Sequence, residues 1–332
     1  NKTRRQLDHV RTSLIKGTKR KGELIRHLLL NTEWDFFLTV FGECHRGGHI
    51  LWPESDPGSA IPSDALLEVY QAVDQSLNSI LDSIDPATTR IILFSLHGMQ
   101  TNMSQEHFVG PVVQRINTLY RQKSLYESRP AGRRSPILLM RNYLPAQLQN
   151  AIARMVPVGV RDWVVNRATS EGYDWERTPA LPLLADYNGY LRFNLKGREA
   201  SGSLQKDEPT YQLYRDWLEA GFQDLHIADG GTPLVGNLVE TAEVFPGARS
   251  DNLPDLIVTW NDQPPATAIE SEVLGNFAAK LDTGRSGNHR HEGFIVVDGP
   301  GKGAAEWQSV THIQDLASVL LDSFLKYRAG KV

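Results

Sequence analysis

The sequence predicts an α/β fold in which a mostly parallel, doubly wound sheet is flanked by helices, with a smaller inserted region. Short β-branched and aromatic runs of strand length alternate with longer stretches whose apolar residues recur at helical spacing. The order strand, helix, strand is typical of parallel sheets, because a crossover helix lets the next strand run in the same direction. The chain has 332 residues, of which 40% are hydrophobic and 22% charged, so it has the composition of a globular protein and the length for one large domain or two smaller ones.

Helices and strands alternate through the first part of the chain. The expected elements are a helix at 22–30, a buried strand at 34–41, a helix at 63–84, a buried strand at 90–95 and a helix at about 106–121. Apolar side chains recur every three or four residues through the helix at 63–84, and Asp85-Pro86 ends it.

The second part of the chain contains the same kinds of element. They are an exposed loop at 127–136, a helix at 145–157, a strand at 187–195, a helix at 207–220, strands at 256–260 and 294–297, and a helix at 312–327. We interpret the region of about 140–250 as an insertion that covers one end of the sheet, within a single domain that spans 1–332.

Composition excludes several classes of protein. The net charge of −4 gives no overall basic field, so we do not expect nucleic acid as a partner. The single cysteine, Cys44, rules out an intrachain disulfide and a cysteine-rich zinc module, and it fits a reducing, cytoplasmic compartment. No apolar run approaches the ~18 residues that a membrane span needs. Assembly into a homo-oligomer stays open.

The start of the chain is basic. It begins at Asn1, and no apolar run typical of a signal peptide follows the basic residues of 1–20. We interpret this start as the interior of a longer protein, and a processed or tagged N-terminus is the alternative.

Three short segments that adjoin predicted strands contain potential metal ligands. In the first, Gly42 to His49, the residues His45 and His49 are four apart, so on a helical turn both imidazoles share one face. Imidazole nitrogens at that spacing can bind one zinc ion at about 2.0–2.1 Å, and Glu43 adds a carboxylate beside them. Two surface histidines in a loop are the alternative.

The other two segments contribute one histidine each. His97 follows the strand at 90–95, and His289 lies in a flexible, basic stretch before the strand at 294–297. The alternatives are a hydrogen-bonded turn and a solvated loop. Since α/β folds place their sites at strand ends, we expect the three segments to share a site for a divalent metal. Neutral imidazole and carboxylate suit zinc, and also manganese or iron.

Taken in order, these segments resemble the alkaline phosphatase superfamily, in particular its type I phosphodiesterase/nucleotide pyrophosphatase branch. The ordered set covers most of the chain and is more specific than any one motif. The matching segments are Trp34-Asp35, Glu43-x-His45-x3-His49-x2-Trp52, residues 95–99, 189–199 and 254–258, Ser286-Gly287-Asn288-His289-Arg290-x-Glu292-Gly293, and Asp315-Leu316-Ala317. The resemblance implies an alkaline phosphatase-like fold and hydrolysis of phosphate esters or phosphodiesters, or of sulfate esters.

The resemblance also implies two metal ions. An Asp-x3-His pair and a late histidine hold one ion in the family, and they fall on His45, His49 and His289, so a histidine replaces the aspartate. The other ion needs an early aspartate, a serine or threonine nucleophile and an Asp-His pair, which falls on Leu96 and His97. That second site therefore keeps only His97. The early aspartate and the nucleophile are expected in a preceding segment, so the catalytic nucleophile is unknown.

Three arginines are candidate substrate-binding residues, because a guanidinium can bind a phosphate or sulfate through two parallel hydrogen bonds. Arg198 lies in a Gly-Arg-Glu turn that the resemblance places near the substrate, and an ion pair with Glu199 is the alternative. Arg46 and Arg290 flank the histidines, and a solvated position is the alternative for both. Cys44 is interpreted as a packed thiol, since the Pro-Ser-Arg type run of sulfatases does not follow it.

The leading hypothesis is a hydrolase that acts on a small phosphorylated or sulfated compound with a divalent metal, with zinc as the first candidate. The second hypothesis is a degenerate relative that binds an anion or a partner without catalysis, motivated by His45 and Leu96. A chain without bound metal and without thermal stabilisation by zinc or manganese would favour it. The third is a transferase on the same fold, which product analysis with alcohol acceptors would distinguish.

Overall fold

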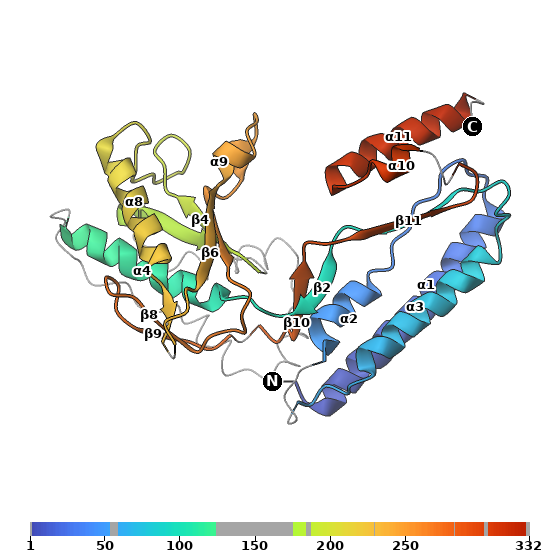
Figure 1. Cartoon of the computed structure of the whole chain (residues 1–332), viewed down its shortest axis with the longest axis horizontal. Helices are drawn as coiled ribbons and strands as arrows, with labels where there is room; N and C mark the ends of the chain where they lie inside the picture. The colour runs from blue at the N-terminus through green and yellow to red at the C-terminus, as the bar shows by residue number, and fades with distance from the viewer. Residues whose placement is uncertain are drawn as a thin grey trace. The chain divides into compact units, whose positions relative to one another are not determined.

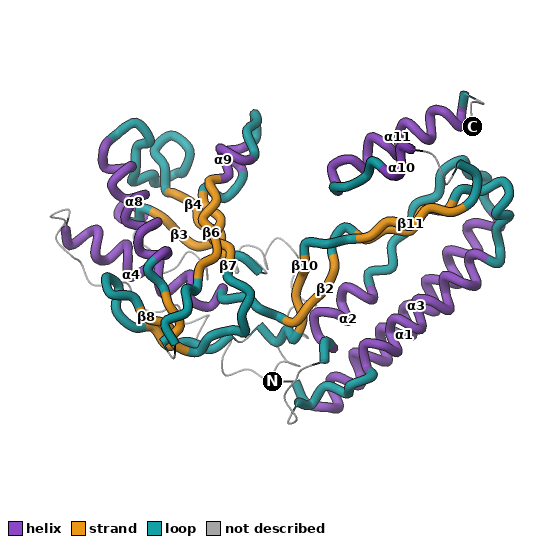
Figure 2. Tube along the Cα trace, in the orientation of Figure 1, coloured by secondary structure: helices purple, strands orange, loops and turns teal. Residues whose placement is uncertain are grey.

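The computed structural model describes residues 2–53, 59–123, 175–183, 187–228, 230–281, 283–301 and 305–329. Contacts divide the chain into two compact units, Asn1–Ser104 with Asp282–Val332 (unit 1) and Gln105–Leu281 (unit 2). Figure 1 labels their elements, and Figure 2 colours them by secondary structure. The expectation of one domain with an insertion at about 140–250 stays a prediction.

Unit 1 is rich in helices. They are α1 (Arg4–Asn31), α2 (Glu43–Leu51), α3 (Ala65–Leu81), α10 (Ala305–Gln308) and α11 (Ile313–Arg328). α1 and α3 lie side by side, as Figure 1 shows, and the short α2 packs against both. Leu7, Leu51, Ala65 and Val69 form the buried apolar cluster between these three helices. This packing fixes α2, which carries three of the candidate ligands, Glu43, His45 and His49.

α1 begins well before the helix that we expected at 22–30. The side chain of Thr3 accepts a hydrogen bond from the backbone N–H of Gln6, and the side chain of Gln6 accepts one from the N–H of Thr3. This capping box satisfies two backbone donors at the helix start, so the basic segment becomes helical from Arg4 onward.

A long antiparallel ribbon completes unit 1. β1 (Ile91–Ser95) pairs with β11 (Phe294–Asp298), and β2 (Gly98–Thr101) pairs with β10 (Gly287–Arg290). Along the second pair, His289 lies opposite Met99. The ribbon therefore brings the segment with His97 beside the segment with His289, although they are far apart in the sequence.

The buried strand that we expected at 34–41 is not formed in the structure. Its residues lie outside the named strands, and among the described residues none of their backbone groups joins a backbone–backbone hydrogen bond. Phe36, Leu38 and Val40 are more than half exposed. A β-branched and aromatic run becomes a strand only where another strand supplies hydrogen-bond partners, which the sequence run does not specify by itself.

Unit 2 is built on an antiparallel sheet. Its order is β3 (Ala180–Leu183), β4 (Gly189–Phe193), β7 (Leu256–Trp260) and β6 (Val235–Glu240). The helices α4 (Glu106–Lys123) and α8 (Pro209–Gln223) contact each other, and α4 also contacts β3. The core between them contains Phe108, Val112, Ile116, Leu191, Tyr214, Leu218 and Val258.

Small elements complete unit 2. They are β5 (His226–Ile227), β8 (Ala268–Glu270), β9 (Phe277–Ala278), the helix α9 (Thr241–Val244) and two 3-10 turns, Trp175–Arg177 and Ser250–Asn252. β8 lies between β5 and β9 in a second antiparallel sheet.

The α/β class is confirmed, but the parallel sheet is not. The expected helices at 63–84, 106–121, 207–220 and 312–327 and the strands at 90–95, 187–195, 256–260 and 294–297 all have counterparts in the structure. Every strand ladder of the described residues is antiparallel, even where a helix lies between the two strands in the chain, as α8 does between β4 and β7. The loop at 127–136 and the helix at 145–157 lie outside the described residues.

A membrane-spanning helix is not found in the described part of the chain, since none of its helices is both long and apolar enough to cross a bilayer.

Candidate metal centre

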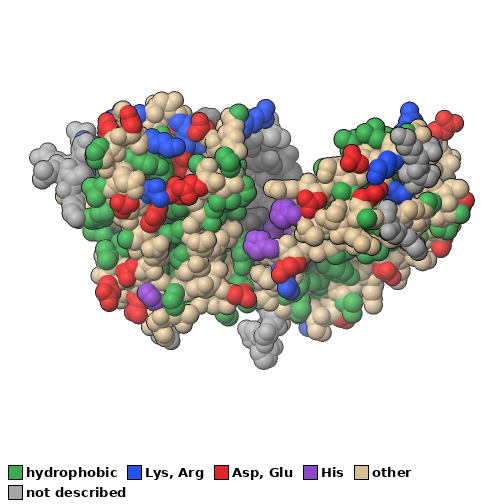
Figure 3. Space-filling model, turned by 45° about the horizontal axis from the view of Figure 1, so that its top comes forward, with side chains coloured by type: hydrophobic (Ala, Val, Ile, Leu, Met, Phe, Trp, Pro, Cys, Tyr) green, Lys and Arg blue, Asp and Glu red, His purple; other side chains and the backbone are tan. Residues whose placement is uncertain are grey.

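Four histidines of unit 1 gather where α2 contacts the β2–β10 pair. His45 and His49 lie on α2, His97 lies in the turn between β1 and β2, and His289 lies on β10. The ring of His289 is 4.2 Å from that of His97, 4.8 Å from that of His49 and 5.0 Å from that of His45, measured between centroids. Histidine side chains are visible at the surface drawn in Figure 3. The three segments therefore lie close together in unit 1, and a shared metal site stays a prediction.

Three of the four histidines lie close enough to share one ion. His45, His97 and His289 each offer a ring nitrogen, and these three nitrogens lie within 4.8 Å of one another. All three side chains are partly exposed, whereas His49 is 8% exposed and lies outside the group. The sequence grouped His49 with His45 and His289 and placed His97 in a second site, so the structure brings together a different trio.

Backbone carbonyls fix the tautomers of two rings. Nδ1 of His49 lies 3.0 Å from the carbonyl oxygen of Gly287, and Nδ1 of His97 lies 2.9 Å from the carbonyl oxygen of Gly98. Because a carbonyl oxygen only accepts, Nδ1 carries the proton in each neutral ring and donates it, which leaves the lone pair on Nε2. A backbone carbonyl on the outer nitrogen is the usual way in which proteins orient a metal-binding histidine.

Glycines let α2 sit directly on β10. A Cβ atom built on Gly287 would lie 2.2 Å from the carbonyl oxygen of Gly48 and 2.8 Å from Cβ of Trp52. The backbone N–H of Ser286 also donates to the carbonyl oxygen of His49 at 2.9 Å. The distance between the two elements that carry His45, His49 and His289 therefore depends on the missing side chain at Gly287.

A buried amide network lies behind His289. Asn288 is fully buried, and its Nδ2 donates to Oδ1 of Asn102 at 3.3 Å, while its Oδ1 accepts from the backbone N–H of His289 at 2.8 Å. Asn102 in turn donates to the carbonyl oxygens of Arg285 (3.2 Å) and Ser286 (3.0 Å). Asn288 lies in the same sequence motif as His289, but the motif indicates no role for it, and nothing in the sequence indicates Asn102.

Glu43 is buried beside the histidines but bound to cations. Its carboxylate accepts from Nζ of Lys21 and from the guanidinium of Arg46, each at 2.8 Å, and the residue is 3% exposed. Glu43 does not belong to the group of His45, His97 and His289, whose ring nitrogens lie within 4.8 Å of one another. Glu43 therefore ties the start of α2 to α1, and Lys21 is a partner that the sequence did not indicate.

The three candidate substrate arginines are all ion-paired. Arg46 binds Glu43, and the exposed Arg290 binds Glu292 at 2.6 Å. In unit 2, both terminal nitrogens of Arg198 donate to the carboxylate of Asp255 at 2.7 Å.

All three side-chain nitrogens of Arg198 donate hydrogen bonds within the protein, including one from Nη2 to the carbonyl oxygen of Phe193. Its Nε donates to Glu199 at 2.8 Å, in addition to the two bonds to Asp255. Burial lowers the pKa of its guanidinium, but the hydrogen bonds and charges of Asp255 and Glu199 outweigh burial and hold the pKa above its ordinary value. The ion-pair alternative therefore describes the geometry of this turn, and a role of Arg198 in substrate binding stays a prediction.

Cys44 precedes His45 on α2. Burial, together with the charge of Glu43, raises the pKa of the Cys44 thiol to about 11. The protonated thiol is a poor nucleophile near neutral pH, which agrees with its interpretation as a packed side chain.

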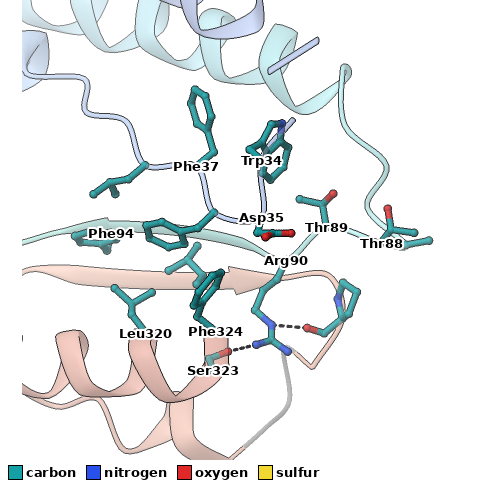
Figure 4. A pocket seen from close by; sticks show the side chains of 15 residues that line it. Trp34, Asp35, Phe37, Thr88, Thr89, Arg90, Phe94, Leu320, Ser323 and Phe324 are labelled. Atoms are coloured by element: carbon teal, nitrogen blue, oxygen red, sulfur yellow. Dashed lines mark hydrogen bonds between the residues drawn. The ribbon is translucent and has the colours of Figure 1, made fainter. Parts of the chain in front are cut away.

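A cavity of about 660 Å³ in unit 1 lies away from these residues. It is lined mainly by aromatic and aliphatic side chains, among them Trp34, Phe37, Phe94 and Phe324, as Figure 4 shows. The guanidinium of Arg90 borders it, held by the carbonyl oxygen of Pro300 at 2.6 Å and by the hydroxyl of Ser323. None of the candidate ligands lines this cavity.

Comparison with known proteins gives one match. The sequence model of a family described as type I phosphodiesterase / nucleotide pyrophosphatase matches residues 2–186, which is more than half of the chain and includes His45, His49 and His97. No curated protein and no solved structure matches the chain.

Proposed function

The chain belongs to the type I phosphodiesterase/nucleotide pyrophosphatase family, a member of the alkaline phosphatase superfamily, and we propose that it hydrolyses phosphate esters or phosphodiesters with a bound divalent metal ion. The observation that carries this proposal is the group of ring nitrogens from His45, His97 and His289, all within 4.8 Å of one another. The family suggests the reaction, and the histidines suggest where in the chain it takes place.

The donor set fits a catalytic metal. Three neutral imidazoles are favourable ligands for zinc, and three protein ligands leave a position open for a substrate. A bound ion would supply a positive charge that polarises the phosphoryl group. His45, His97 and His289 would hold it, while the backbone contact of His49 with Gly287 keeps α2 in place on β10.

The proposed substrate is a small phosphorylated compound, and sulfate esters are a further possibility of the same chemistry. The attacking nucleophile stays unassigned. A second candidate function, binding of an anion or a partner without catalysis, is favoured by one observation: among the described residues, no carboxylate joins the histidine group.

Hydrolysis of bis(p-nitrophenyl) phosphate and p-nitrophenyl phosphate by the metal-loaded chain tests the proposal. We expect turnover of at least one of them, with a loss of at least 100-fold in kcat/KM for His289→Ala, because the variant lacks one of three ligands. His312→Ala is the matched control, since His312 is exposed and lies outside the group. No turnover by the wild type, in the presence of one bound metal ion, would favour the second candidate.

A further inference from the structure

The histidine group mixes residues that the family resemblance places in two different metal sites. His45 and His289 come from the first, and His97 comes from the second, yet their ring nitrogens lie within 4.8 Å of one another. Nitrogens that share one tetrahedral zinc ion lie roughly 3.4 Å apart, given metal–nitrogen bonds of about 2.0–2.1 Å. Small rotations of the three partly exposed imidazole rings can bring their nitrogens to this shorter separation.

We infer that the chain holds a single divalent ion on nitrogen ligands alone, from His45, His97 and His289, in place of a pair of ions. Two ions at a shared site lie about 3.5–4 Å apart, and bridging or terminal carboxylates normally offset their mutual repulsion. No aspartate, glutamate or cysteine joins the group among the described residues.

The acidic residues closest in sequence are already bound to cations. Glu43 accepts hydrogen bonds from Lys21 and Arg46, and Glu292 accepts them from Arg290. Recruiting either carboxylate to a second ion would therefore break an existing ion pair.

His49 is a positioning residue under this inference. Its ring packs 4.7 Å from that of His45 and 4.8 Å from that of His289, and its Nδ1–H donates to Gly287 in the interior. It is buried and lies outside the ligand group. It therefore supports two of the ligands from behind, as residues outside the coordination sphere of a metal do.

Metal content separates this arrangement from the two-site one. The chain is stripped with a chelator, loaded with zinc or cobalt(II), freed of excess ion and analysed for bound metal per chain. We expect one ion in the wild type, one in His49→Gln, whose amide can still donate to Gly287, and none in His97→Ala. His312→Ala, outside the group, should also keep one ion. Circular dichroism confirms that each variant is folded.

Two results would overturn the inference: two ions in the wild type, or one ion retained by His97→Ala together with loss in His49→Gln. The number of ions bound by the wild type tests the inference without any variant, so the test holds even if a variant misfolds. The inference shares its metal with the proposed function, but the two can fail separately. One bound ion without ester hydrolysis refutes only the hydrolase, and two bound ions with hydrolysis refute only the single-ion site.

Discussion

Replacing Gly287 with alanine should loosen the histidine cluster, although Gly287 has no side chain that could bind a metal ion. The added Cβ would lie 2.2 Å from the carbonyl oxygen of Gly48, and since ordinary contacts are about 3.5 Å, β10 and α2 must separate by about 1 Å. Gly48 lies within α2, so its carbonyl cannot rotate away as a side chain would. The separation stretches the bond from His49 Nδ1 to Gly287 and the bond from Ser286 to His49.

The magnitude follows from these contacts. Overpacking a close-packed contact costs about 1–3 kcal/mol, and weakening a buried hydrogen bond costs about 1 kcal/mol more, so we expect a loss of about 3 kcal/mol. For a unit of this size, the midpoint of thermal unfolding should fall by roughly 6–12 °C. Metal affinity should fall roughly 10–100-fold, as it does when residues that orient metal ligands are changed.

Two other glycines of the same region provide matched controls. A Cβ on Gly42 meets nothing within 4 Å, so Gly42→Ala should change stability by less than about 1 kcal/mol. A Cβ on Gly48 meets the flexible end of Met99 at 2.8 Å, which can move, so Gly48→Ala should have a smaller effect than Gly287→Ala. Thermal unfolding measures the stability of each variant, and competition for zinc with a chelator measures its metal affinity. If Gly287→Ala matches Gly42→Ala in both, the contact between α2 and β10 does not hold the cluster.

Three further changes test other parts of the account. Arg198→Ala removes the paired hydrogen bonds to Asp255, so urea unfolding should show that unit 2 is less stable by about 3 kcal/mol. The KM for a phosphate ester should stay unchanged, and a raised KM would show that Arg198 binds substrate. Asn288→Ala leaves Oδ1 of Asn102 and the backbone N–H of His289 without their hydrogen bonds to the Asn288 side chain, so thermal unfolding should show a loss of about 1–3 kcal/mol. Zinc binding should weaken as well, and a loss of stability with unchanged zinc binding would show that Asn288 supports only the fold. The hydrogen bond from the hydroxyl of Ser271 lowers the pKa of the Asp224 carboxyl. This bond therefore stabilises the fold above the pKa of Asp224 in the unfolded chain, and the stabilisation is lost as the pH falls through the pKa of Asp224 in the folded chain. In Ser271→Ala, NMR should show Asp224 titrating nearer its ordinary pKa, and an unchanged titration would contradict this cause.

The sequence predicted local elements more successfully than their pairing. Apolar spacing identified α3, and continuous apolar runs identified β1, β7 and β11. The expectation that the strand at 90–95 is buried was wrong, since Leu93 of β1 and Phe294 of its partner β11 are exposed, whereas β7 is buried at alternate positions. Whether a strand pairs in parallel depends on the partner that the folded chain supplies. The ribbon joins Phe94 to Ile295 across the chain, and local spacing carries no information on that register.

For the candidate site, the sequence likewise predicted individual residues but not their arrangement. Each histidine was found from its place beside a predicted strand, and the turn with Arg198 was found from the family resemblance. Which of the histidine nitrogens lie within 4.8 Å of one another was not predictable, because this depends on the packing of α2 on β10, in which Nδ1 of His49 lies against the carbonyl oxygen of Gly287. The ion pair of Arg198 with Asp255 spans 57 positions in the sequence, so a helix or turn pattern could not reveal it.

Anomalous diffraction at the zinc absorption edge, from crystals of the zinc-loaded chain, would locate the metal ion itself. We expect one anomalous peak in unit 1, within about 2.0–2.1 Å of a ring nitrogen from each of His45, His97 and His289. A chain that takes up zinc but has no peak among these residues, or whose peak is ligated by His49 with His97 left out, would contradict this expectation.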